Sequence, residues 1–188
     1  MTITDMYRSA RTERKSAFVV AATPIGPLAH AVDAYRQAVA VRVGTNAAHH
    51  SPPHCLLALS FDEEPSATDV YRRALARATR DDRGVNAVTL AALTTTPVWH
   101  GLELESGELI AVATRFAQEV AASASTRHVA VHHRLRLTLA CGFEARDRDA
   151  LCEFAHRIVD PALPAEWRVG LWVATGGDWA SVPQVCAG

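Results

Sequence analysis

Two short stretches of this 188-residue chain carry side chains that could do acid–base or anion-binding chemistry. Residues 54–56 read His-Cys-Leu at the start of an apolar run, and residues 136–138, about eighty positions later, read Arg-Leu-Thr. An imidazole can take up or release a proton near neutral pH, whereas a guanidinium group stays protonated and offers only hydrogen-bond donors. His54 is therefore a candidate acid or base, and Arg136 a candidate for polarising an oxygen.

The second stretch has the period-two alternation of a half-buried β-strand. Leucines occupy every second position from 135 to 139, and Arg134, Arg136 and Thr138 lie between them. The leucines should face a core, and the three polar residues should share the opposite face. We expect that face to line a cleft, with Thr138 catalytic beside Arg136 and with Arg134 contacting the substrate.

The first stretch leads into a predicted partner strand over residues 54–60. On this strand Leu56 and Ala58 are the apolar positions expected to hold a hydrophobic part of the ligand. His100, at the start of another predicted strand, is a further candidate for contacting the substrate. Its alternative role is structural, with Glu103 on the opposite face of the same strand.

Two histidines next to the second stretch are candidates for a further acid. His132 precedes Arg136 by four residues, so an unbroken strand would place both on one face, roughly 13 Å apart. His133 would then point the other way, and a one-residue bulge would exchange the two. We treat His132 as a candidate catalytic residue and His133 as a candidate substrate contact.

Residues 53–55 and 135–143, taken together, resemble the paired motifs of the 2H phosphoesterase superfamily. That superfamily includes the 2',5' RNA ligase-like proteins and the cyclic nucleotide phosphodiesterases. Its pattern is His, any residue, then Thr or Ser, found twice on facing strands of a bilobal α+β fold. Residues 100–106 and the closing stretch 167–179 also resemble one branch of it, so that the resemblance covers residues 17–182.

The resemblance implies a mechanism in which one histidine accepts a proton and the other donates one to the leaving oxygen. This sequence departs from the pattern in both motifs. Leu56 stands where the pattern has a hydroxyl, and Arg136 stands where it has a histidine. Because Arg136 cannot release a proton, the two-histidine mechanism is not available as written.

Three functions remain open at this point. The first is a working 2',3'-cyclic or 2',5' phosphodiesterase. The second is a biosynthetic enzyme whose cleft has been repurposed for cyclisation, isomerisation or hydrolysis of a small organic molecule, with His54 as acid or base. The third is a non-catalytic protein that binds a nucleotide or another anion. We favour the second, because exchanging a hydroxyl for Leu56 while keeping an imidazole indicates a changed substrate.

The elements that must position these residues follow from periodicity and turn residues. Strands are predicted over residues 17–22, 54–60, 86–93, 98–105, 131–141, 167–175 and 179–182. Helices are predicted from Pro27 to Gly44, from a capping box at residues 66–69 to about residue 80, from Ser106 to about 123, and over 146–159. Each half reads strand, helix, motif strand, helix.

This order predicts an α+β fold with two lobes, antiparallel sheets flanked by helices and a central cleft. Residues 1–16 are expected to be a leader, and residues 17–188 a single bilobal domain. The lobes should span about residues 17–93 and 97–185, with terminal strands exchanged between them.

Composition argues against several other classes of protein. The net charge of −1 gives no reason to expect nucleic acid as a partner, and no apolar run is long enough to span a membrane. Four cysteines without a CxxC pair suggest buried thiols in a reducing cytoplasm. His49, His50 and His54 lack an acidic or cysteine ligand nearby, so we expect neither a metal nor a cofactor. The partner expected is a small molecule.

Overall fold

The computed structural model describes residues 16–63, 67–80, 88–123, 128–175 and 178–183. The strands in this part of the chain are β1 (Ser16–Ile25), β2 (Cys55–Glu63), β3 (Thr89–Thr95), β4 (Trp99–Glu105), β5 (Ala130–Val131), β6 (Leu135–Cys141), β7 (Glu166–Thr175) and β8 (Asp178–Val182). The α-helices are α2 (Pro27–Arg42), α3 (Thr68–Ala78), α4 (Gly107–Ser123) and α5 (Arg148–Ile158). The predicted leader lies outside the described residues, apart from its last residue.

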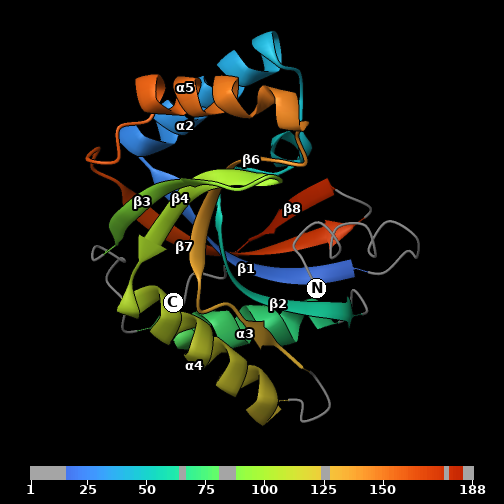
Figure 1. Ribbon diagram of the computed structural model, residues 1–188. Helices are drawn as coiled ribbons and strands as arrows, with labels where there is room; N and C mark the ends of the chain where they lie inside the picture. The colour runs from blue at the N-terminus through green and yellow to red at the C-terminus, as the bar shows by residue number, and fades with distance from the viewer. Residues whose placement is uncertain (1–15, 64–66, 81–87, 124–127, 176–177, 184–188) are drawn as a thin grey trace.

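The strands form one antiparallel sheet in the order β3-β4-β6-β2-β1-β7-β8, with β5 paired to β2. Helices α2 and α5 lie together at one end of the molecule, and α3 and α4 lie together at the other, with the strands between them (Figure 1). The fold is therefore α+β, as predicted, and its strands form one large antiparallel sheet. No helix within the described residues is long and apolar enough to cross a membrane.

The two motif strands meet at a single point of the sheet. Among the described strand pairs, β2 and β6 share only the pair Cys55–Leu137. On one side of this bridge, β6 continues through β4 to β3, and on the other, β2 continues through β1 and β7 to β8. Beyond the bridge, β2 pairs with the short β5 instead.

The main core lies between the sheet and the helices. It contains the predicted apolar stripe of α2, with Leu28, Val32, Tyr35 and Val39 buried. It also contains the leucines of β6, which face inward as the alternation predicted. A second, smaller cluster lies on the opposite, open face of β1, β2, β7 and β8.

A bulge in β2 changes which of its side chains face the core. Val20 pairs with Ala58 but Ala21 pairs with Leu56, so that Leu57 is an extra residue on β2. Leu57 and Ala58 consequently both lie in the main core, whereas Leu56 lies on the open face. Ala58 is fully buried and does not share the face of Leu56, contrary to the prediction that it contacts a ligand there.

The other elements agree with the sequence, with two exceptions. The Ser106 hydroxyl accepts a hydrogen bond from Leu109 N and caps α4 as predicted. The continuous strand predicted over residues 131–141 is wrong, because residues 132–134 separate β5 from β6. The capping box predicted for α3 begins at Ser66, outside the described residues, and the helix has Ala67 as its N-cap without a side-chain hydrogen bond.

Candidate functional site

The bridge between β2 and β6 places the motif side chains on one face of the sheet. Cys55 and Leu137 point into the main core, so the residues on either side of them project to the opposite face. This open face carries His54 and Leu56 from the first motif and Arg136 and Thr138 from the second. The predicted pairing of the two motif strands is therefore present.

His54 is held as a neutral imidazole with a defined tautomer. Its Nδ1–H donates a hydrogen bond of 2.8 Å to the carbonyl oxygen of Pro52, so that Nε2 carries the free lone pair. The side chain is 8% exposed, and this burial lowers its pKa from 6.5 to about 4, with a further contribution from the charge of Arg36. At neutral pH His54 is therefore unprotonated and can act as a base through Nε2, although a weaker one than an exposed imidazole.

An aromatic cluster covers the imidazole. The ring of Trp179 lies 4.5 Å from the ring of His54, and the ring of Trp172 lies 6.4 Å from that of Trp179, both measured between centroids. Leu56 belongs to the same apolar cluster. Apolar and aromatic side chains therefore surround the His54 side of the site.

The Arg136 side of the site is polar, with two arginines that share one carboxylate. The guanidinium lies 4.5 Å above the ring of Trp99 and donates to Glu103 at 3.4 Å. Arg134, which is exposed, hydrogen-bonds the same carboxylate oxygen. The hydrogen bond from Arg134 is the main reason that the pKa of Glu103 is lowered, with Arg136 adding to it. Among the described residues, the guanidinium of Arg136 hydrogen-bonds Glu103 through one nitrogen, and its Nε is buried without a partner.

Thr138 and Trp99 are also joined. The indole N–H of Trp99 donates a hydrogen bond of 3.0 Å to the Thr138 hydroxyl oxygen. Gly101 lies beneath the ring of Trp99, where a Cβ would come within 2.7 Å of the indole and 2.3 Å of the Leu137 carbonyl oxygen. Only glycine leaves room for the indole in this position.

A buried arginine behind the sheet connects the two motif strands. Arg36 of α2 donates to the carbonyl oxygen of Ser51, at 2.7 Å, and to that of Thr138, at 3.3 Å. The first carbonyl lies in the loop that leads to His54, and the second lies on β6. Sequence reasoning missed Arg36, because its helical spacing alone marks it as one more residue of an amphipathic helix.

The structure places the other predicted residues away from this face or at its margin. His100 is fully buried on the helix-covered face, with its ring 6.0 Å from that of Tyr35 and its Nδ1 2.6 Å from the Thr95 hydroxyl oxygen. It cannot contact a ligand beside Arg136, which corrects the prediction of a substrate contact. Burial also lowers the pKa of His100 to about 4.

His132 and His133 lie in the break between β5 and β6. The four-residue spacing would place His132 on the same face as Arg136 only in an unbroken strand, and the strand is interrupted here. The backbone N–H of His132 donates to the Leu57 carbonyl at 2.8 Å, and its half-buried imidazole has a lowered pKa, mainly through burial. His133 is exposed.

The tryptophans of the site were also missed as functional residues. The pairing of β7 with β8 aligns Trp172 with Ser181 and Ala174 with Trp179, which puts both tryptophans on one face. The period-two spacing of two predicted strands around a glycine turn carried this signal. Trp99 could not be found in this way, since its contact with Thr138 spans 39 residues.

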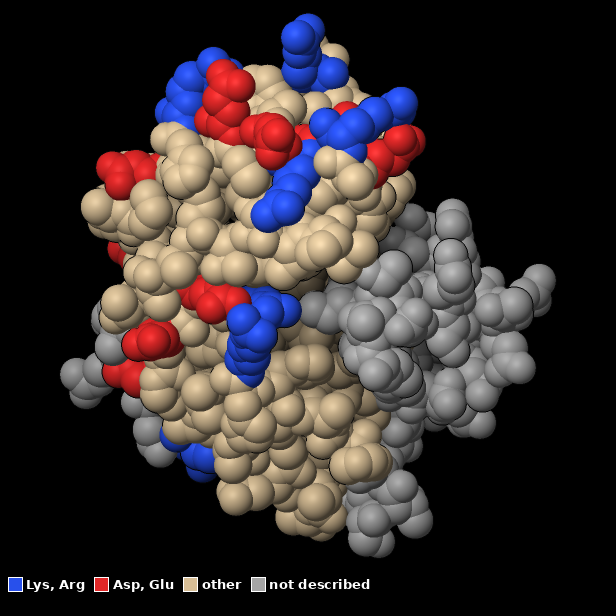
Figure 2. Space-filling model, viewed as in Figure 1, with Lys and Arg blue, Asp and Glu red and all other residues tan. Residues whose placement is uncertain are grey.

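Charge and metal-binding groups add little to the site. Most charged side chains in the view of Figure 2 gather over the end that holds α2 and α5, with blue and red interspersed. Within the described residues, His, Cys, Asp and Glu side chains form no group of three or more that could hold a metal ion. Cys55, Cys141 and Cys152 are free thiols in the strands and the helix predicted for them.

Comparison with known proteins gives little to set beside this geometry. No family model matches the chain, and no curated protein matches it. Among solved structures, it is similar to a conserved protein of unknown function from Agrobacterium tumefaciens, with a TM-score of 0.47 and 12% sequence identity. The similarity covers 92% of this chain and 88% of that one.

Proposed function

We propose that the open face carrying His54, Arg136 and Thr138 is the cleft of a bilobal, 2H phosphoesterase-like enzyme that acts on a small organic molecule other than a phosphodiester. The two strand groups that meet at the Cys55–Leu137 bridge correspond to its lobes. The observation that carries the proposal is the presence of a neutral imidazole and a guanidinium on the same sheet face, on strands joined at the Cys55–Leu137 bridge.

The proposed roles of His54 and Arg136 follow from the chemistry of their side chains. His54 Nε2 takes a proton from the substrate or from a water, and Arg136 binds the oxygen on which negative charge develops. In hydrolysis, the water oxygen attacks the carbonyl carbon while its proton moves to Nε2. The carbonyl electron pair moves to the oxygen held by Arg136. Collapse expels the leaving oxygen, which takes the proton back from His54.

Isomerisation uses the same two groups in the same way. A proton on the carbon next to a carbonyl moves to Nε2 of His54, and the electron pair passes to the carbonyl oxygen, where Arg136 holds the enolate. Return of the proton to another position completes the reaction. No oxidant, reductant or second proton donor is required.

Two features support a substrate that is not a phosphodiester. Leu56 and the aromatic cluster of Trp172 and Trp179 make the His54 side apolar. Glu103 offsets one of the two positive charges of Arg134 and Arg136, so this side attracts a phosphate less than two unpaired arginines would. Phosphodiester hydrolysis also lacks its second histidine, since His100 lies on the other face and His132 lies beyond the end of β6.

Two probe reactions test the proposal directly. Dihydrocoumarin hydrolysis reports on water activation, and exchange of the α-protons of 2-tetralone in D2O, followed by NMR, reports on proton abstraction from carbon. The wild-type protein should accelerate at least one of them, and His54→Phe, which keeps a ring against Trp179, should abolish that rate. His30→Phe, on the exposed face of α2, is the matched control.

The same assay with 2',3'-cyclic AMP separates the alternatives. His54-dependent hydrolysis of the cyclic nucleotide by the wild-type protein would make it a phosphodiesterase and overturn the proposal. Turnover of none of the three probes would leave a non-catalytic binder as the function.

A further inference from the structure

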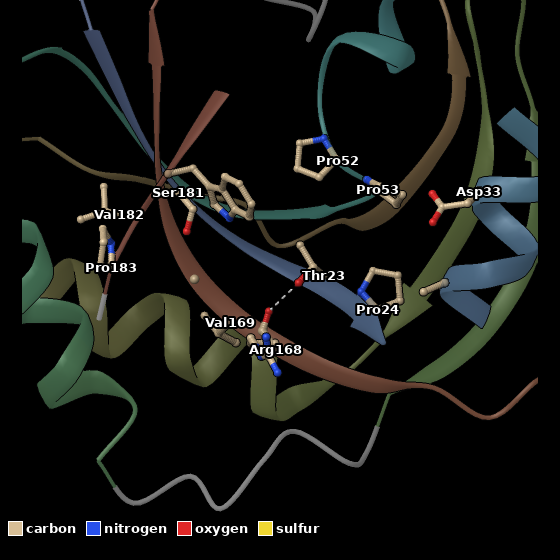
Figure 3. Close-up of a pocket in the computed structure, with 13 residues that line it drawn as sticks. Thr23, Pro24, Asp33, Pro52, Pro53, Arg168, Val169, Ser181, Val182 and Pro183 are labelled. Atoms are coloured by element: carbon tan, nitrogen blue, oxygen red, sulfur yellow. Dashed lines mark hydrogen bonds between the residues drawn. The ribbon is translucent and has the colours of Figure 1, made fainter. Parts of the chain in front are cut away.

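A cavity of about 490 Å³ opens on the same sheet face, beside the aromatic cluster. Figure 3 shows Asp33 at one end of it and Val182 at the other, with Thr23 and Arg168 between them. The register aligns Thr23 with Arg168 and Trp172 with Ser181, so these lining residues belong to neighbouring strands of one face. The volume is within the range of small-molecule sites.

The cavity shares two walls with the His54 site. Pro52, whose carbonyl oxygen accepts the hydrogen bond from His54 Nδ1, lines it. Trp172 lines it too, and its ring lies against Trp179, which covers His54. Pro52 and the Trp172–Trp179 pair therefore separate a ligand in the cavity from the imidazole of His54.

One buried donor in the wall has no acceptor. Nε1 of Trp172 is buried and without a hydrogen-bond partner among the described residues. Gly170 also lines the cavity, and a Cβ there would come within 3.4 Å of this nitrogen. An unpaired buried N–H costs about 1–3 kcal/mol, so a ligand acceptor that reached this nitrogen would recover that cost.

The remaining lining restricts the class of ligand. Pro24, Pro52, Pro53 and Val169 supply apolar walls that suit a flat ring. The two charged residues, Asp33 from α2 and Arg168 from β7, are exposed and of opposite sign. The cavity as a whole therefore favours neither an anion nor a cation.

We infer that this cavity holds the body of the substrate, an uncharged, ring-containing molecule with a carbonyl or similar acceptor that binds the indole N–H of Trp172. The inference rests on the proposed function, because it names the substrate class of the same site. It adds a specificity-determining residue, Trp172, and a binding subsite beyond the two motif strands.

Direct binding tests the cavity without any need for turnover. Coumarin carries a carbonyl on a flat bicyclic ring, and naphthalene has a similar shape without an acceptor. Ligand-observed NMR with each compound gives a dissociation constant for the wild-type protein and its variants. Coumarin should bind the wild-type protein more tightly than naphthalene does.

Four variants locate the binding. Gly170→Val should remove coumarin binding by filling the cavity, and Ala180→Val, on the exposed opposite face of β8, should not. Ser181→Phe fills the cavity from an exposed position and serves where Gly170→Val does not fold. Trp172→Phe should weaken coumarin roughly three- to tenfold, the value of one hydrogen bond, and leave naphthalene unchanged.

The outcomes distinguish the cavity from the catalytic proposal. Coumarin binding that both filling variants retain, or no binding to the wild-type protein, would overturn the inference. Coumarin binding that Gly170→Val abolishes, in a protein without His54-dependent turnover, would keep the cavity as a binding site while the proposed chemistry fails.

Discussion

The ring of Trp179 lies against the imidazole of His54, with 4.5 Å between the two centroids. This contact joins the last strand of the sheet to the first motif and shields the imidazole from water. Because burial is the main cause of its lowered pKa, the acid–base behaviour of His54 depends on a residue 125 positions away in the chain.

Removing the Trp179 indole should therefore return the pKa of His54 toward its ordinary value. In Trp179→Ala, we expect the pKa of His54 to rise from about 4 toward 6.5, because water reaches the ring. An NMR titration of the imidazole nitrogens measures it. Trp179→Phe should keep most of the shift, and His100, which has a similar pKa, is the internal reference. A pKa for His54 that stays near 4 in Trp179→Ala would disprove this account.

The two buried histidines should make the fold sensitive to moderate acid. Both pKa values are lowered from 6.5 to about 4, so between these pH values the unfolded chain binds protons that the folded chain does not. The free energy of unfolding should fall as the pH drops from 6.5 to 4, by up to about 3 kcal/mol for each histidine. Above pH 6.5 their contribution is constant.

Urea unfolding at pH 7, 5.5 and 4 measures this dependence. His54→Phe should remove about half of the part that the two histidines contribute, because both shifts are of similar size. An equal slope in the variant and the wild-type protein would show that folding does not lower the pKa of His54.

Gly101→Ala should destabilise the protein and release Trp99. The added Cβ would come within 2.3 Å of the Leu137 carbonyl oxygen and 2.7 Å of the Trp99 ring, both too close for any side chain. We expect a loss of roughly 1–3 kcal/mol in the free energy of unfolding. Gly107→Ala, where nothing lies within 4 Å of the new Cβ, should lose nothing. Similar urea midpoints for the two variants would contradict the prediction.

Arg36→Met should weaken both the fold and the site. The change leaves the carbonyl oxygens of Ser51 and Thr138 without their donor, at a cost of at least about 2 kcal/mol. It also removes a charge that lowers the pKa of His54, so this pKa should rise. Gln37→Met, exposed on the same helix, is the control. An unchanged unfolding midpoint would show that other contacts hold the two segments.

Restoring the superfamily pattern should change the chemistry. The double variant Arg136→His, Leu56→Thr provides a second histidine and a second hydroxyl on the face that carries His54 and Thr138. We expect it to hydrolyse 2',3'-cyclic AMP, measured by release of the 2'- or 3'-phosphate product, while the wild-type protein does not. A wild-type rate equal to that of the variant would count against a repurposed cleft.

The sequence was sufficient for most elements because their signals are local. The leucine alternation identified β6 and the side of it that faces the core, and the spacing of Leu28, Val32, Tyr35 and Val39 identified α2. The pairing of the two motif strands through Cys55 and Leu137 depends on residues about eighty positions apart, so local periodicity could not show it.

The errors arose where a single residue changed the register. The bulge at Leu57 turns Ala58 into the core. The interruption at residues 132–134 means that the even spacing of His132 and Arg136 no longer places them on one strand face. Neither the bulge nor the interruption can be recognised from the spacing of hydrophobic residues in the sequence. Arg36 and Trp99 were missed for another reason, since they act through partners distant in the chain.

The single residue pair between β2 and β6 has a mechanical consequence. A single residue pair restricts the angle between two strand groups less than a continuous ladder of hydrogen bonds would. Helix α2 packs on both β1 and β6, and Arg36 hydrogen-bonds both motif segments. The helix therefore connects the two strand groups in addition to the Cys55–Leu137 pair. Helix α2 and Arg36 therefore help to set the placement of the two motif segments relative to each other, from the side of the sheet opposite His54 and Arg136.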